Sequence, residues 1–124
     1  MNQNTSLGRL GESYVADCLT RQGWTIIERN WRFHRLGELD LVAIEPTADG
    51  PTLVFIEVKT RSGTSFGQPI DAVTPTKADR LYRLAGAWLR QRRVSVDRLR
   101  LDVVGVLHRP PDDWRLTHLR GVMR

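Results

Sequence analysis

The sequence predicts a single α/β domain with a mixed β-sheet and the element order α-β-β-β-α-β-β. The chain has 124 residues, which is within the usual size of one domain. Hydrophobic residues make up 40% of it and charged residues 27%, a composition typical of folded chains rather than disordered ones. Two segments have the apolar spacing of helices, and five are rich in branched and aromatic residues, as strands are. Residues 1–124 are therefore expected to form one domain.

The first half of the chain is predicted to form one helix followed by three strands. The helix is expected from Leu7 to about Gln22, because apolar residues such as Leu10 recur there at helical spacing, and Ser6 is its expected N-cap. The strands are expected at residues 24–32, 38–45 and 52–60. Turn-forming residues at 46–51 would join the last two as an antiparallel pair. The third strand contains a continuous apolar run, so we expect it at the centre of the sheet.

The second half is predicted to form a loop, a helix and two strands. The loop covers residues 61–73. Thr74 and Pro75 then supply an N-cap and a first-turn proline for a helix that runs to about Arg92. Its apolar stripe consists of Leu81, Leu84, Ala85 and Trp88. Strands are expected at residues 100–107 and 114–119, the last of them at an edge of the sheet.

The composition excludes several classes of protein. Cys18 is the only cysteine, so an internal disulfide and a cysteine-built zinc site are excluded. The three histidines lack the spacing of a metal-binding pair. No stretch approaches the roughly 18 apolar residues that cross a bilayer, and charges at Arg9 and Asp17 interrupt the region where a signal peptide would be apolar. We therefore expect a cytoplasmic protein without a membrane partner.

Charged residues interrupt two strands whose interiors should be apolar. Glu57 and Lys59 follow the apolar run of the third strand, and residues two apart in a strand share a face. Asp40 lies on the preceding strand and could converge with Glu57 if the register allows. Burying such charges is costly unless they are paired or bind a cation, and carboxylate oxygens suit Mg²⁺. The alternative is a structural ion pair between Glu57 and Lys59, with Asp40 an unrelated turn acid.

These residues belong to a pattern that extends along nearly the whole chain. An acid on one strand, followed on the next strand by Glu-x-Lys, resembles the PD-(D/E)XK, or restriction-endonuclease-like, superfamily. More closely, the chain resembles the bacterial YraN-like proteins, a family of predicted endonucleases distantly similar to archaeal Holliday-junction resolvases. The resemblance implies a restriction-endonuclease-like mixed central sheet flanked by helices. The stretches that carry it are Gly8–Glu12, Asn30–Arg32, Gly37–Ala43, Val54–Arg61, Gly67, Val73–Lys77 and Leu101–Val104.

The resemblance implies a role for several residues. Asp40 and Glu57, with the backbone carbonyl of Val58, would ligate one or two Mg²⁺ or Mn²⁺ ions. Lys59 would orient or deprotonate the attacking water, or neutralise charge that develops on the phosphate. Glu12 would reach in from the first helix as a further acid. The expected catalytic residues are therefore Asp40, Glu57, Lys59 and Glu12.

Two of these assignments have alternatives. Glu38 lies two residues before Asp40 and on the same face, so it would be the ligand instead if the strand register differs. Glu12 would otherwise be an acid of the first helical turn, where the helix dipole favours negative charge.

The resemblance to Holliday-junction resolvases also suggests that the protein forms a homodimer.

The excess of positive charge lies in one segment. The formal net charge is +5, and residues 75–100 hold eight basic residues against two acidic ones. Basic side chains that neutralise phosphates bind nucleic acid without regard to sequence, and the chain has no base-reading motif. Lys77, in the first turn of the second helix, is either a phosphate contact or a solvated lysine. The expected nucleic-acid-binding residues are Arg32, Arg61, Lys77, Arg80 and Arg83.

Together these features predict a Mg²⁺-dependent endonuclease that acts on DNA phosphodiester bonds, structured or branched DNA included, with little sequence specificity. One alternative is a nucleic-acid-binding module with a nuclease fold, whose cleavage activity is absent or depends on a partner. A second is an interaction protein whose arginine-rich helix docks an acidic partner. The set of Asp40, Glu57 and Lys59 favours the enzyme, because a pure binding module would not need it.

Overall fold

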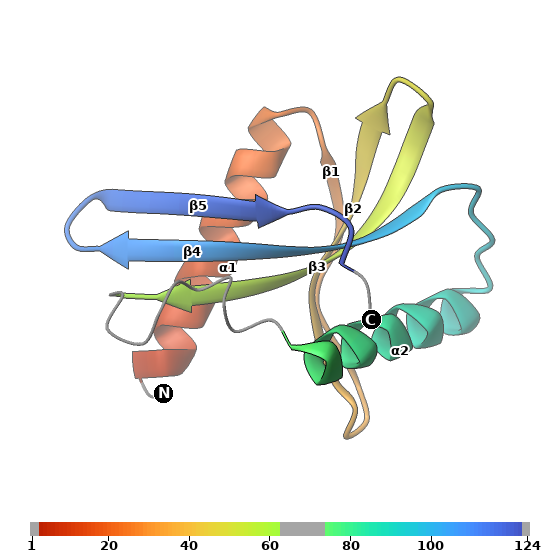
Figure 1. The fold of residues 1–124 in the computed structure, drawn as a ribbon, viewed down its shortest axis with the longest axis horizontal. Coiled ribbons are helices and arrows are strands. Elements are labelled where there is room, and N and C mark those ends of the chain that lie inside the picture. The colour runs from red at the N-terminus through yellow and green to blue at the C-terminus, as the bar shows by residue number, and fades with distance from the viewer. Residues whose placement is uncertain (1–2, 63–73, 123–124) are drawn as a thin grey trace.

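The computed structural model describes residues 3–62 and 74–122, which form two helices and five strands in the predicted order (Figure 1). The helices are α1 (Gln3–Arg21) and α2 (Pro75–Arg92). The strands are β1 (Thr25–Phe33), β2 (Gly37–Thr47), β3 (Gly50–Arg61), β4 (Leu99–Arg109) and β5 (Asp113–Leu119). The predicted α/β class is confirmed. Most of the predicted loop at 61–73 lies outside the described residues.

The strands form one mixed sheet in the order β1-β2-β3-β4-β5. Neighbouring strands are antiparallel except β3 and β4, which are parallel. A parallel pair needs a crossover connection, and α2 lies in it. As predicted from its apolar run, β3 is central, and the prediction that the last strand, β5, lies at an edge is also confirmed. The predicted turn between the second and third strands is also confirmed, with Thr47 opposite Gly50.

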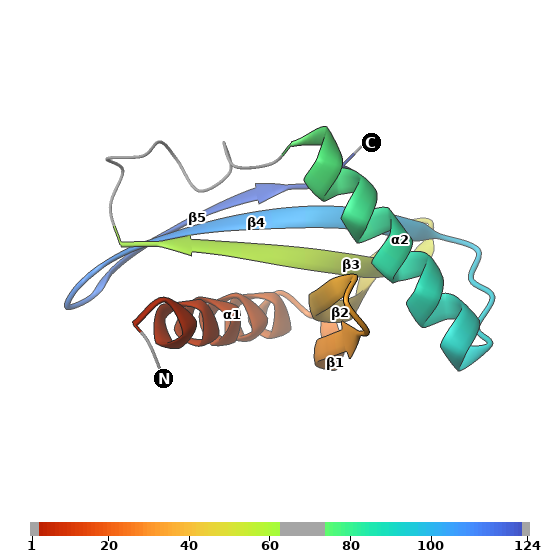
Figure 2. The same cartoon turned by 90° about the horizontal axis from the view of Figure 1, so that it is seen from below.

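The two helices cover opposite faces of the sheet (Figure 2). One apolar core joins α1 to the strands, and a second joins α2 to the other face. The predicted stripe of α2 is buried, and Thr74 caps this helix by accepting a hydrogen bond from the backbone N–H of Lys77. Neither helix is long and apolar enough to cross a membrane, which holds for the described residues.

A glycine lets α1 approach the sheet closely. A Cβ atom at Gly11 would lie 1.9 Å from Oγ1 of Thr60 on β3 and 2.8 Å from its Cγ2. No other residue type leaves this space free, because only glycine lacks a Cβ. The contact fixes the distance between α1 and the end of β3. Glu12 is the next residue of the helix. Gly11 therefore sets the position from which Glu12 reaches the sheet.

The beginning of α1 differs from the prediction. The helix starts at Gln3, so Ser6 lies inside it and is not its N-cap. Leu10, which the spacing placed on the apolar stripe, is 49% exposed. The face that packs on the sheet follows Gly11, Val15 and Leu19 at four-residue intervals, and Leu10 is turned about 100° away from it.

A buried ion network ties the end of the chain to the sheet. Asp102 on β4 is fully buried and accepts hydrogen bonds from the Arg100 side chain, from His118 and from the backbone N–H of Gly121. Burial alone would raise the pKa of Asp102, but the hydrogen bonds from His118 and Arg100 outweigh it and hold that pKa below its usual value. The network is therefore a structural ion cluster of the kind that buried charges require.

Candidate functional site

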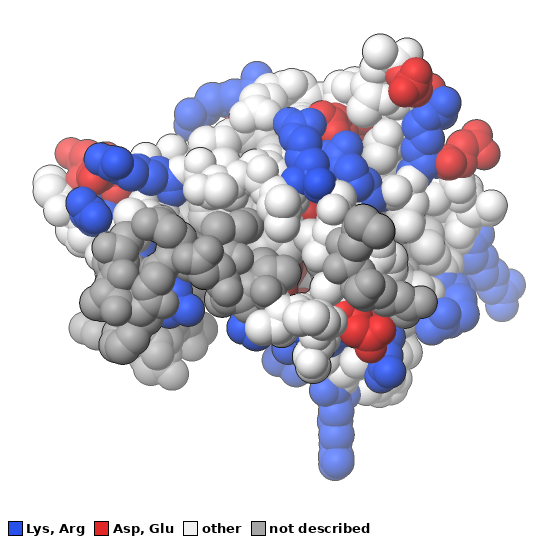
Figure 3. All heavy atoms as spheres, viewed as in Figure 1, with Lys and Arg blue, Asp and Glu red and all other residues white. Residues whose placement is uncertain are grey.

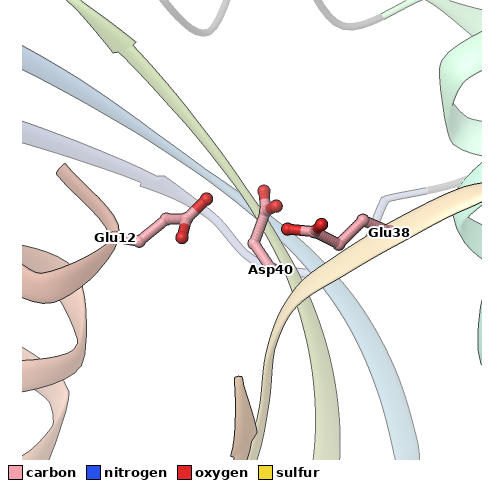
Figure 4. Close-up of side chains that lie close together, drawn as sticks. All are labelled: Glu12, Glu38 and Asp40. Carbon is pink, nitrogen blue, oxygen red and sulfur yellow. The ribbon is translucent and has the colours of Figure 1, made fainter. Parts of the chain in front are cut away.

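Three carboxylates meet where α1 approaches the beginning of β2. Glu12 comes from α1, and Glu38 and Asp40 come from β2. One carboxylate oxygen of each lies within 4.8 Å of the others, and Figure 4 shows the three side chains gathered at one point. Glu12 lies well inside α1, so the alternative that it is a first-turn acid is wrong. Both candidate ligands of the second strand, Glu38 and Asp40, belong to the group.

Asp40 is held at the point where β2 separates from β3. The last paired residues are Leu41 and Ile56. Beyond them, the backbone N–H of Val58 donates a hydrogen bond to Oδ2 of Asp40 at 2.7 Å. The side chain thus satisfies a backbone donor of β3, which fixes the carboxylate beside that strand. Metal ligation by the Val58 carbonyl stays a prediction.

The surroundings of Asp40 disfavour its negative charge. The pKa of Asp40 is raised overall from its ordinary value of 3.8 to about 7. Burial is the largest cause, the hydrogen bond from Val58 opposes it, and the negative charges of the neighbouring acids Glu12, Glu57 and Glu38 add to the rise. Near neutral pH, a large share of the molecules therefore carry a proton on Asp40 unless a cation offsets the local charge.

Asn30 joins two of the carboxylates, a role that was not predicted from the sequence. Its Nδ2 donates to Oε2 of Glu12 at 2.6 Å and to Oε1 of Glu38 at 2.9 Å. Its φ of 52° lies in the left-handed region, which asparagine tolerates better than most residues. In the sequence, the feature that sets Asn30 apart is that it is an asparagine inside a predicted strand, where this residue type is depleted. Arg9 adds positive charge, with Nη1 3.5 Å from Glu12 and 3.7 Å from Glu38.

Glu57 and Lys59 lie beside this group but are paired with one another. Nζ of Lys59 is 3.6 Å from Oε1 of Glu57, and Nη2 of Arg80 donates to the same oxygen at 2.8 Å. The Glu57 side chain is only 12% exposed. The ion pair of the structural alternative is therefore present, whereas Asp40 is not an unrelated acid, because the charge of Glu57 acts on its pKa. Among the described residues, Glu57 is not one of the three mutually close carboxylates.

Comparison with known proteins places the chain in a family. The model of the uncharacterised protein family UPF0102 matches residues 11–106, which include all the acids described above and Lys59. This chain belongs to the UPF0102 family. A UPF0102 protein of Paenarthrobacter aurescens (strain TC1) is 46% identical over 122 residues, or 98% of this chain and 97% of the relative. A UPF0102 protein of Acidothermus cellulolyticus is 47% identical over 126 residues, or 94% of this chain and 92% of the relative.

In this UPF0102 protein, three predicted nucleic-acid contacts lie on α2. Arg80 is turned toward Glu57, as described above. Arg83 is exposed and pairs with Asp79 one turn earlier, with Nε 2.9 Å from Oδ2. Lys77 is half-buried at the start of the helix. Of these three residues, only Arg80 contacts a proposed site residue within residues 3–62 and 74–122.

The other two predicted contacts lie on strands. Arg32 on β1 is exposed, and Arg61 is the last residue of β3. Arg61 follows Lys59 by two residues, and its Nε is buried without a hydrogen-bond partner among the described residues. Figure 3 shows basic side chains in several parts of the visible face, including the end of α2. Phosphate binding by these residues of the UPF0102 protein stays a prediction.

Asp40→Asn is expected to stabilise the metal-free UPF0102 protein more at high pH than at low pH. The pKa of Asp40 is near 4 in the unfolded chain and about 7 in the folded protein, so its protonated carboxyl stabilises the fold at low pH. This contribution to stability is lost as the pH rises through about 7. The amide cannot ionise, so the melting temperature of the variant minus that of wild type should grow by at least about 4 °C between pH 5 and pH 8. Exposed Asp49→Asn is the control, and a difference that does not change with pH would contradict this expectation.

Proposed function

We propose that this UPF0102 protein is a Mg²⁺-dependent endonuclease that cleaves DNA phosphodiester bonds, branched DNA included, with little sequence specificity. The observation that carries the proposal is the half-buried Asp40, which lies beside Glu12 and Glu38 and next to the strand that bears Glu57 and Lys59. The resemblance of these residues to the PD-(D/E)XK superfamily supports the same function.

The carboxylate group fits a divalent cation. Carboxylate oxygens are the ligands that Mg²⁺ and Mn²⁺ prefer. Here one carboxylate oxygen from each of three side chains lies within 4.8 Å of the other two. Their mutual repulsion, which helps to raise the pKa of Asp40, is what a cation would relieve. Asp40, Glu12 and Glu38 would hold the metal, and Glu57 would join them when Arg80 releases it. When bound, such a cation polarises the scissile phosphate and lowers the pKa of the attacking water.

The neighbouring side chains have distinct tasks in this proposal. Asn30 orients the carboxylates of Glu12 and Glu38 through its two hydrogen bonds. Lys59 holds the attacking water or offsets charge on the phosphate. Arg80 pairs with a phosphate of the substrate in place of Glu57.

One observation favours a second candidate, a nucleic-acid-binding module that cleaves only with a partner. Oxygen Oε1 of Glu57 is shared by two cations, Arg80 and Lys59. Because these two cations already neutralise the negative charge of Glu57, a partner or a particular substrate would be needed to free its carboxylate for a metal ion. Tight, salt-sensitive DNA binding without cleavage in Mg²⁺ or Mn²⁺ would support this candidate.

A cleavage assay with a panel of substrates tests the proposal. Wild-type protein is incubated with linear, nicked, flapped and four-way-junction DNA and with RNA, in Mg²⁺, Mn²⁺ or EDTA. We expect metal-dependent cleavage of DNA that is lost in Glu57→Ala and reduced about 10- to 100-fold in Asn30→Ala. Circular dichroism confirms that both variants are folded. Absence of cleavage on every substrate, or cleavage unchanged in Glu57→Ala, would overturn the assignment.

A further inference from the structure

An open apolar cavity lies at the opposite end of β2 and β3 from the carboxylates. It has a volume of about 350 Å³, within the range of small-ligand pockets and large enough for one bulky side chain. It is lined by residues of β1, of the β2–β3 hairpin, of the end of α2 and of the segment that follows α2. The residues that give it an apolar character are Ile27, Ile44, Leu53, Trp88, Val94 and Val96. Among the described residues, the charged ones that line it are Asp97 and Arg98.

Part of this lining is exposed to solvent. Ile27 is 42% exposed, Val94 40% and Val96 36%. These three are among only seven large apolar residues that are exposed in the described parts of the chain, so such residues are concentrated here. Contiguous exposed apolar surface marks interaction sites more often than scattered apolar residues do. The cavity therefore has the character of a surface that another molecule covers.

The inner wall of the cavity is fixed before any ligand arrives. Trp88 is 5% exposed, and its Nε1 donates to Oε1 of Glu28 at 2.9 Å. Arg92 pairs with Glu28 as well, and its guanidinium carbon lies 5.5 Å from the centre of the Trp88 ring. The ring packs edge-to-face on Phe55 in the core. A preformed apolar wall lowers the entropy cost of binding.

The chain around the cavity is basic. The segment 92–98 contains Arg92, Arg93 and Arg98 against the single acid Asp97. Arg92 is paired with Glu28, whereas Arg93 and Arg98 form no salt bridge within residues 3–62 and 74–122. Both of these arginines are exposed. Arg98 lines the cavity, and Arg93 directly precedes the lining residue Val94. These two arginines therefore complement negative charge beside the cavity, while the cavity itself complements an apolar group.

We propose that this cavity binds an acidic segment of a partner protein, with one bulky apolar side chain in the cavity and flanking carboxylates on Arg93 and Arg98. A nucleic acid fits less well, because its phosphates would pair with the arginines but leave the apolar wall uncovered. The cavity is separate from the carboxylate group, since Trp88 is two helical turns, about 12 Å, beyond Arg80 along α2. The inference does not rest on the proposed nuclease activity and extends the role of α2 to protein binding.

Fluorescence anisotropy with designed peptides tests the proposal. The probe is a short fluorescein-labelled peptide with one phenylalanine flanked by aspartates. We expect it to bind full-length protein with a Kd in the micromolar range, roughly 1–100 μM, and more weakly as salt rises. Peptides with alanine in place of phenylalanine, or asparagine in place of the aspartates, should bind at least about 10-fold more weakly, since each removes one half of the interaction.

Exposed variants locate the binding surface. Val96→Asp and Arg98→Glu should each weaken binding at least about 10-fold, because they place negative charge at the rim. Arg115→Glu changes the net charge as much as Arg98→Glu does, but on exposed β5 away from the cavity, and should have little effect. The proposal is overturned if the peptide does not bind at about 1 mM, if the three variants behave alike, or if the alanine peptide binds equally well. It is also overturned if an oligothymidine binds more tightly than the peptide and is equally sensitive to Val96→Asp.

Discussion

Lys59→Met is expected to slow DNA cleavage by roughly 10²- to 10⁴-fold, the usual contribution of a positioned proton-transfer or charge-neutralising group. The variant removes the ammonium group but keeps most of the apolar stem, so the end of β3 should remain folded. Since Lys59 is paired with Glu57 and is not itself a metal ligand, Mn²⁺ affinity should change little or increase. Single-turnover cleavage and calorimetric titration with Mn²⁺ measure the two properties separately.

Two further lysine variants sharpen this prediction. Lys77→Met removes the only other lysine of the chain, at the start of α2, and should reduce cleavage at most through weaker DNA binding. Lys59→Arg keeps the charge but replaces a compact group of tunable pKa with a guanidinium. Full activity of Lys59→Arg would mean that only the charge is needed. Full activity of Lys59→Met would remove Lys59 from the site.

Gly11→Ala is expected to lower the free energy of unfolding by about 2–3 kcal/mol, because overpacking of a well-packed contact costs this much. The new methyl group would lie 1.9 Å from Oγ1 and 2.9 Å from Cβ of Thr60. Rotation of the Thr60 side chain cannot move its Cβ, so α1 or β3 has to shift. Urea unfolding followed by circular dichroism measures the change.

Gly8→Ala in the same helix is the matched control. Outside its own helix, a Cβ atom at Gly8 meets no atom of the described residues within 4 Å, so this variant should gain up to about 1 kcal/mol from the higher helix propensity of alanine. Opposite signs for the two variants would show that the contact with Thr60, and not helix propensity, decides the outcome at Gly11. A stabilised Gly11→Ala would contradict the close approach of α1 to the sheet.

The sequence alone determined those features that depend on local signals. Thr74 and Pro75 predicted the start of α2, because capping and proline preferences act within one turn. The continuous apolar run predicted that β3 is central, because burial on both faces leaves no polar alternation. The two-residue period placed Glu57 and Lys59 on one face, where they form an ion pair. None of these features requires knowledge of a distant part of the chain.

Only the tertiary structure decided which side chains meet. The left-handed backbone of Asn30 and its bonds to Glu12 and Glu38 join three elements, and no local pattern encodes such a meeting. Gly11 is recognisable as the contact point only when α1 is placed on β3. The cavity beside Trp88 likewise exists only because α2 and the segment after it are brought together with β1, β2 and β3. The physical reason is the same in each case: these contacts join residues far apart in the sequence, and their geometry is fixed by packing and strand register rather than by local preference.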